Sequence, residues 1–156
     1  MDQIAEASDD TQRPKRRMPV GVDSTVPSVA RVYDALLGGK DNFAVDRAVA
    51  DKLMELTPGG ADVGRYNRAV LGRGVRHMVS QGIDQFSDLG AGLPTVQNTH
   101  EVAQSVNPNA KVVYVDNDPM VLVHGRALLA ENGNTTVITA DLSEPDAVLD
   151  NDDLRA

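Results

Sequence analysis

Three strand-like runs alternate with two helix-like segments in the second half of this chain, and this order constrains the fold more than any other feature. The runs are IDQFSD at 83–88, KVVYVD at 111–116 and TTVITAD at 135–141. The middle run is almost continuously apolar, as expected for a strand that is buried on both faces of a parallel sheet. Because parallel neighbours need right-handed crossover connections, the sequence predicts an α/β fold with a doubly wound parallel sheet.

The segments that follow each strand have the start and stop signals of helices. We expect the first helix to cover 94–106, because proline is tolerated in the first turn. Asp118 and Pro119 open the second as N-cap and first helical residue, and Gly133 closes it. A short helix is expected near 145–150.

Three further helices are predicted before the first strand, over 27–37, 44–56 and 61–80, with glycines at the ends of all three. Apolar residues at helical spacing define the faces expected to be buried. They are Val29, Val32, Tyr33, Leu36 and Leu37 in the first helix, Val45, Val49, Leu53 and Leu56 in the second, and Val63, Tyr66, Asn67, Val70, Leu71, Gly74, Val75 and Met78 in the third.

The composition narrows the function classes. The chain has 156 residues, no cysteine and a formal net charge of −8. It forms no disulfide or thiolate metal site and fits the reducing cytoplasm, where we expect it. An acidic chain repels phosphate backbones, so no nucleic-acid partner is expected. We interpret Arg65, Arg68, Arg73 and Arg76 as a solvated basic face, with steering of an acidic substrate as the alternative.

Residues 1–24 are polar and charged, and we predict a disordered tail there. The PKRR cluster at 14–17 is interpreted as solvated charge, with contact to an anionic partner as the alternative. The N-terminus has no secretory signal pattern, and no apolar run approaches the roughly 20 residues of a membrane span, so no membrane association is expected.

A sheet of three parallel strands is thin, and its outer strand presents an open edge. We therefore expect either that the sequence is the first half of a longer protein or that a partner covers the edge. The oligomeric state is left open.

Acidic residues lie at or just after the ends of the three predicted strands: Asp88, Asp116 and Asp141. In open α/β sheets, ligands bind outside the carboxyl ends of the strands. Three carboxylates at this edge predict a ligand that is rich in hydroxyl and amine groups.

Gly90 and Gly92 follow the first strand in DLGAG. They permit a close approach of the backbone to a ligand, and the following helix N-terminus would offer N–H groups to an anion. A tight structural turn is the alternative. The dinucleotide fingerprint G-x-G-x-x-G would need a third glycine where Thr95 stands.

The other two acids have distinct expected roles. Asp116 is placed to accept both hydroxyls of a ribose, and a local cap or turn is the alternative. Asp141 is placed to accept the amine of an adenine, with Leu142 or Met120 packing on the ring. A turn-forming aspartate is the alternative there.

These features together resemble the class I S-adenosylmethionine-dependent methyltransferases, which have a Rossmann-like sheet. In that superfamily the first strand ends in D/E-x-G-x-G, which Asp88, Gly90 and Gly92 match. An acid after the second strand binds ribose, which Asp116 matches, and an acid after the third recognises adenine, which Asp141 matches. The resemblance covers about residues 25–156.

The run PSVARVYDALLGGKDNFAVDRAVADKL at 27–53, with the later VDNDP segment, resembles more narrowly an actinobacterial methyltransferase group once filed as the domain of unknown function DUF574. The family's sheet has seven strands, and this chain reaches only the third. The resemblance therefore implies an N-terminal half, with a helical cap or lid at 25–82 and a partial cofactor-binding domain at 83–156.

The resemblance implies S-adenosylmethionine as cofactor and in-line transfer of its methyl group to an acceptor, for which we expect a small molecule. Segment 38–43 is the candidate lid, and Arg31 could instead pair with Asp34. Tyr33, on the apolar stripe, could equally be a core residue. The residues implied to contact the cofactor, beyond the three acids and two glycines, are Ala91, Asn117, Met120, Leu142, Arg31, Tyr33, Lys40 and Asn42.

Two other functions compete with this interpretation. One is an NAD-binding oxidoreductase, which shares the strand–helix order and Asp116 but lacks the third glycine. The other is a non-catalytic S-adenosylmethionine-binding fragment without the substrate half. His77, His100 and His124 have no metal-ligand spacing, so no metal site is predicted, and no catalytic residue or general base is assigned.

Overall fold

The computed structural model describes residues 20–95, 97–129 and 133–155. Most of the predicted tail, residues 1–19, lies outside this part of the chain, and so does the PKRR cluster. Residues 20–24 are described, and Val22 packs against a buried cluster that contains Leu93, Met120 and Val121.

A single parallel sheet forms the centre of the fold, as predicted. It contains β1 (Gln85–Leu89), β2 (Lys111–Asp116) and β3 (Thr135–Thr139) in the order β1-β2-β3. Asp88 is in register with Tyr114, and Asp116 with Thr139. The strand ends therefore lie at one edge of the sheet, which is the arrangement that brings their acidic residues together.

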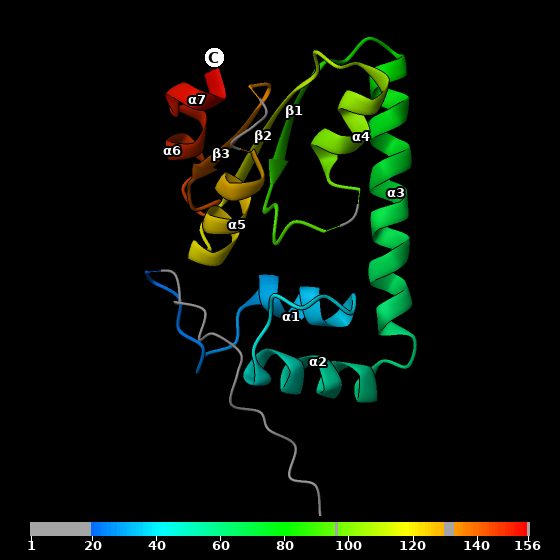
Figure 1. The fold of residues 1–156 in the computed structure, drawn as a ribbon, viewed down its shortest axis with the longest axis vertical. Coiled ribbons are helices and arrows are strands. Elements are labelled where there is room, and N and C mark those ends of the chain that lie inside the picture. Colours follow the sequence, from blue (N-terminus) through cyan, green and yellow to red (C-terminus); the bar gives the residue numbers. More distant parts are fainter. Residues whose placement is uncertain (1–19, 96, 130–132, 156) are drawn as a thin grey trace, which may run out of the picture.

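Helices cover both faces of the sheet, which confirms the layered α/β architecture (Figure 1). On one face lie α3 (Gly60–Ser80), α4 (Thr99–Val106) and α5 (Pro119–Leu129). The short helices α6 (Pro145–Leu149) and α7 (Asp152–Arg155) cover part of the other. Alternate residues of each strand point to opposite faces, so each layer buries its own set of valines.

The two cores follow this alternation. Val75, Val79 and Val102 from α3 and α4 pack against Val112 of β2, with Tyr114 at their side. On the opposite face Val115, Ile138 and Val148 form the second core. These clusters contain no tryptophan and only one phenylalanine, Phe86, at the margin of the first.

The two remaining helices, α1 (Val29–Leu36) and α2 (Ala44–Leu56), lie beyond the carboxyl ends of the strands (Figure 1). Their bounds agree with the prediction. The buried faces of α2 do not: Val49, Leu53 and Leu56 are 36%, 42% and 70% exposed. The helix instead buries Asp46 and Ala50, because its contact with α1 is built on an ion pair and a small side chain.

Helix α3 has the predicted length, but only part of the predicted face meets the core. Val63, Tyr66 and Val70 are 63%, 71% and 56% exposed. The buried row contains Gly64 and Gly72, together with Val75 and Val79. Glycine lets α1 approach closely, since a Cβ at Gly64 would lie 3.0 Å from Leu37 Cδ2. The predicted face is therefore wrong at Val63, Tyr66 and Val70 but confirmed at Val75, which is buried, and at Leu71, which packs against the core.

The start of α4 is also different from the prediction. The helix begins at Thr99, not at Pro94. Asn98 precedes it, with its N–H donating to Glu101 Oε2 at 2.9 Å and its Oδ1 accepting the Thr95 N–H at 2.9 Å. Asn98 and Glu101 form a capping box, in which each side chain accepts the backbone N–H of the other residue and so satisfies donors that lack partners at a helix N-terminus.

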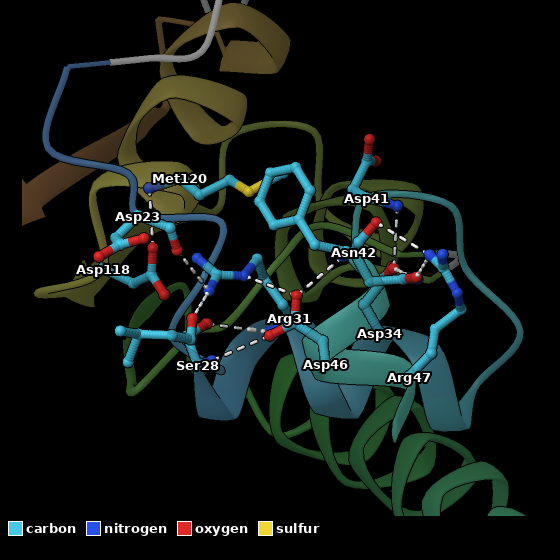
Figure 2. A network of polar contacts seen from close by, with 12 residues as sticks. Asp23, Ser28, Arg31, Asp34, Asp41, Asn42, Asp46, Arg47, Asp118 and Met120 are labelled. Atoms are coloured by element: carbon cyan, nitrogen blue, oxygen red, sulfur yellow. Dashed lines mark hydrogen bonds and ion pairs between the residues drawn. The ribbon is translucent and has the colours of Figure 1, made fainter. Parts of the chain in front are cut away.

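A buried polar network joins α1 and α2 (Figure 2). Arg31 Nε donates to Asp46 Oδ2 at 2.9 Å, and Arg31 Nη2 donates to the carbonyls of Asp23 and Val26. Asp46 also accepts the backbone N–H groups of Ser28 and Phe43. Burial raises the pKa of Asp46, but the hydrogen bonds outweigh burial, and the resulting pKa is below its usual value.

Within the described part of the chain, no helix combines the length and the apolar character that crossing a bilayer requires.

Candidate functional site

The largest cavity described, about 840 Å³, lies between the carboxyl ends of the three strands and the helices α1 and α3. It has the size typical of small-molecule sites. All three strand-end acids line it. The other predicted site residues in its lining are Tyr33, Gly90, Ala91, Gly92, Asn117 and Leu142.

The loop after β1 is a tight turn whose amides are already in use. Gly90 and Gly92 have φ values of +71° and +67°, which are strained for any residue with a side chain. The N–H groups of Gly90 and Ala91 donate to the Val115 carbonyl at 2.9 and 3.2 Å, and the Gly92 N–H donates to Asp116 Oδ2 at 2.9 Å. The loop therefore forms part of the cavity wall, but these three amides are not free to bind an anion.

The helix N-terminus that was expected to offer N–H groups to an anion is likewise engaged. The helix α4 begins seven positions after Gly92, and the Thr95 and Asn98 amides donate to side chains. In the first turn itself, the His100 N–H donates to the Tyr114 hydroxyl and the Glu101 N–H to the Asn98 side chain, so these two amides are not free to bind an anion.

Each carboxylate oxygen of Asp116 accepts one backbone N–H. Its Oδ2 holds the Gly92 N–H, and its Oδ1 accepts the Asp118 N–H at 2.9 Å. Each carboxylate oxygen has two lone pairs, so both oxygens retain capacity to accept a ligand hydroxyl. The structural and the ligand-binding interpretations of Asp116 are therefore compatible.

Asp88 lies on the inner wall of the cavity. Its Oδ2 accepts the Thr99 hydroxyl at 2.6 Å. A second, small cavity of about 30 Å³ is lined by Asp88 together with His100 and Tyr114. His100 Nδ1 lies 2.8 Å from the Tyr114 hydroxyl, and burial lowers the pKa of His100 and raises that of Tyr114. Both groups are consequently neutral at pH 7.

Asp141 lies at the far side, after β3. Its Oδ1 accepts the backbone N–H and the hydroxyl of Ser143, each at 2.8 Å, and these bonds lower the pKa of Asp141. Its Oδ2 lies 3.4 Å from Asn117 Nδ2. One oxygen of Asp141 therefore forms the turn and the other accepts from Asn117, while the residue lines the cavity together with Leu142.

Four predicted cofactor residues do not line this cavity. Arg31 is 3% exposed and paired with Asp46, not with Asp34 (Figure 2). Met120 is 7% exposed in the cluster with Leu93 and Val121. Asn42 bonds to Asp34 and Arg47, and Lys40 lines a separate cavity of about 530 Å³. These four residues are not part of the candidate site, because each makes its contacts elsewhere or lines a different cavity.

Two charged residues of the site escaped the sequence analysis. Asp118 was assigned as an N-cap, and its Oδ1 does accept the Met120 N–H at 2.8 Å, but the residue also lines the cavity. Arg68 was assigned to a solvated face, yet it is half-buried and is the one cationic residue in the described lining. Its spacing of four residues from both Gly64 and Gly72 is the signal that places it on the buried row.

The donor and acceptor set of the cavity fits S-adenosylmethionine. Four aspartates line the cavity: Asp88, Asp116, Asp118 and Asp141. They can accept hydrogen bonds from hydroxyl, amine and ammonium groups, and their negative charge favours a cation. Among the described residues, no group of three histidine or acidic side chains is placed to hold a metal ion.

A parallel sheet with a glycine turn and acids at its strand ends, all facing one cavity, defines the nucleotide-binding α/β class of proteins. Residues 15–156 match the model of a family described as S-adenosyl methyltransferase, and the chain belongs to that family. Class and family agree with the resemblance found in the sequence.

Two solved structures are similar to the chain. One is a protein from Thermobifida fusca YX, provisionally assigned as a methyltransferase, with a TM-score of 0.83, 62% identity and coverage of 85% of this chain and 50% of that one. The other is a DUF574 family protein from Streptomyces avermitilis MA-4680, with a TM-score of 0.80, 42% identity and coverage of 85% and 52%. The chain spans about half the length of each. No curated protein matches it.

Proposed function

We propose that the chain binds S-adenosylmethionine in the cavity at the strand ends and serves methyl transfer to a small-molecule acceptor. The observation that carries this proposal is the convergence of Asp88, Asp116 and Asp141 on one cavity beside the turn at Gly90 and Gly92. The order β1-β2-β3 lays the three acids in a row, which suits an elongated ligand with an amino acid, a ribose and a base.

S-adenosylmethionine, when bound, would supply an electrophilic methyl group on a positively charged sulfur for transfer to the acceptor. The residues of this chain contribute binding and orientation. Asp116 accepts the ribose hydroxyls, Asp141 the adenine amine, and Gly90 and Gly92 leave room for the ligand against the backbone. Positioning of this kind supplies several kcal/mol to a transfer reaction.

We further propose the division of labour expected from the sequence. Residues 25–82 act as a helical cap, from which Tyr33 lines the cavity, and residues 83–156 carry the cofactor site. The Tyr33 hydroxyl is held by the Gly64 carbonyl and Asn67 Nδ2, each at 3.3 Å. These contacts support a fixed wall over the cavity at this point.

Titration calorimetry of the purified chain with S-adenosylmethionine, and with NAD as the competing ligand, tests the proposal. We expect Asp116→Ala to weaken S-adenosylmethionine binding by about tenfold to a hundredfold, because it removes a charged acceptor and loosens the Gly92 turn. Asp153→Ala, an exposed acid on α7, is the matched control and should bind as the unaltered chain does. Binding of NAD in preference to S-adenosylmethionine would instead support the oxidoreductase alternative.

Binding without turnover is the second candidate function. It is favoured by the span of the chain, about half of each similar solved structure. A calorimetric signal with S-adenosylmethionine, together with no S-adenosylhomocysteine formed in the presence of candidate acceptors, would support a cofactor-binding half without catalysis.

A further inference from the structure

We propose that Arg68 recognises the carboxylate of the cofactor's amino-acid portion. The inference rests on the proposed function, since it assigns one end of S-adenosylmethionine within the same cavity. It concerns a residue that lies 20 positions before the first strand-end acid and outside every motif in that strand-end region.

The position of Arg68 on α3 brings its side chain into the protein. The residue lies on the same row as Gly64 and Gly72, both of which are buried. A Cβ at Gly72 would lie 3.3 Å from Gln97 Oε1, so the loop before α4 approaches the helix closely on this row. Arg68 lines the main cavity, the small cavity behind the glycine turn and the 530 Å³ cavity, so it lies where all three meet.

The guanidinium of Arg68 has no carboxylate partner among the described residues, in contrast to three other arginines. Arg31, Arg65 and Arg155 each pair with a carboxylate. Arg68 Nη2 donates to the Thr95 hydroxyl, but its Nε is buried and has no acceptor among the described residues. A buried donor without a partner is costly, and a carboxylate matches the guanidinium fork with two parallel hydrogen bonds.

Other donors near this end of the cavity are occupied. The amides of Gly90, Ala91 and Gly92 donate within the protein. Those of Thr95 and Asn98 donate to the Asn98 and Glu101 side chains. A ligand carboxylate that enters here would therefore find in Arg68 a donor that still has an unused N–H.

The net negative charge of the cavity favours pairing of a ligand carboxylate with Arg68. Four aspartates and one arginine line it, so an unpaired carboxylate would be repelled while an ammonium or sulfonium would be attracted. Arg68 and Asp88 share two of the cavities, on the β1 side, whereas Asp141 lies after β3. This arrangement places a zwitterionic amino acid at the β1 side and the adenine at the β3 side.

The test compares two neutral thioethers that differ only at the amino-acid end. S-adenosylhomocysteine carries the amino acid, and methylthioadenosine lacks it. In calorimetry we expect Arg68→Gln to weaken S-adenosylhomocysteine by about tenfold to a hundredfold and to leave methylthioadenosine unchanged. Arg73→Gln, an exposed arginine on the same helix, is the matched control and should change neither affinity.

A third ligand isolates the carboxylate without altering the protein. This ligand is an S-adenosylhomocysteine analogue with hydrogen in place of the carboxylate. The unaltered chain should bind it more weakly than S-adenosylhomocysteine itself. The factor should equal the one by which Arg68→Gln weakens binding of S-adenosylhomocysteine. Arg68→Gln should not distinguish the two ligands, since the coupled pair is then already broken. Arg68→Lys, which keeps the charge but not the fork, should show an intermediate loss for S-adenosylhomocysteine only.

Equal weakening of S-adenosylhomocysteine and methylthioadenosine in Arg68→Gln would overturn the inference, because a merely structural arginine affects both. Equal binding of the carboxylate-free analogue and S-adenosylhomocysteine by the unaltered chain would overturn it independently of any variant. Failure of the unaltered chain to bind either adenosine thioether would contradict the proposed cofactor site itself, and this inference with it.

Discussion

Replacement of Asp46 by alanine should lower the free energy of unfolding by about 3–5 kcal/mol, the cost of leaving one charge of a buried pair alone. Asp46 is 0% exposed and Arg31 is 3% exposed. The carboxylate accepts Arg31 Nε at 2.9 Å, the Phe43 N–H at 2.8 Å and the Ser28 N–H at 3.0 Å. Its removal leaves a buried guanidinium and two backbone donors without these acceptors. Urea denaturation at pH 7 measures the loss.

The matched control is Asp51→Ala, which removes an exposed acid from the same helix and should cost less than about 0.5 kcal/mol. Because the folded pKa of Asp46 is below its usual value, its contribution is present above the unfolded pKa of about 3.9. The contribution is lost as the pH falls through the folded pKa. The stability gap between the unaltered chain and Asp46→Ala should therefore narrow below about pH 4; a gap that is small at pH 7 would contradict the role assigned to this pair.

Gly39→Ala is expected to destabilise the chain by about 3 kcal/mol, through overlap with a side chain that cannot move away. A Cβ at Gly39 would lie 2.0 Å from Asp34 Oδ1 and 2.4 Å from its Cγ. Asp34 is 4% exposed, and its Oδ2 accepts the Asp41 N–H at 3.0 Å and Asn42 Nδ2 at 2.8 Å. Any movement of Asp34 therefore breaks bonds that shape the turn after α1. Thermal unfolding followed by circular dichroism reports the change.

The neighbouring glycine separates steric overlap from backbone strain. Gly38 has a φ of +78°, but no atom lies within 4 Å of the position its Cβ would take. Gly38→Ala should consequently cost only the left-handed penalty of about 1–2 kcal/mol. Equal losses in the two variants would show that overlap with Asp34 is relieved in solution and would contradict the expected result.

The features that followed from the sequence are those that depend on local pattern and topology. The apolar run of β2 and both ends of α2 agree with the expected positions. The convergence of Asp88, Asp116 and Asp141 also followed, because parallel strands end at the same edge whatever packs around them.

The errors arose where tertiary contacts outweigh local pattern. Hydrophobic spacing pointed to Val63 and Val70 on α3, but glycines make the contact, and they carry no hydrophobic signal. For the same reason, Arg68 was predicted to lie on the solvent-exposed face of α3. For α4, Pro94 obscured a start signal that was present, the Asn98 and Glu101 pair at capping spacing. Arg31 was expected to contact the cofactor, as the family resemblance implied, or to pair with Asp34, but its partner Asp46 lies 15 residues away on another helix and was not predictable from the surface of α1 alone.

The network at Arg31 and Asp46 also anchors one part of the cavity wall. One ion pair ties together the carbonyls of Asp23 and Val26, the start of α1 and the start of α2. Displacement of any one of these segments would disturb the contacts of the same two buried charges. Val29 and Tyr33 of α1 line the cavity, so this part of the cavity wall is anchored to α2 and to the residues before α1 by the same buried ion pair.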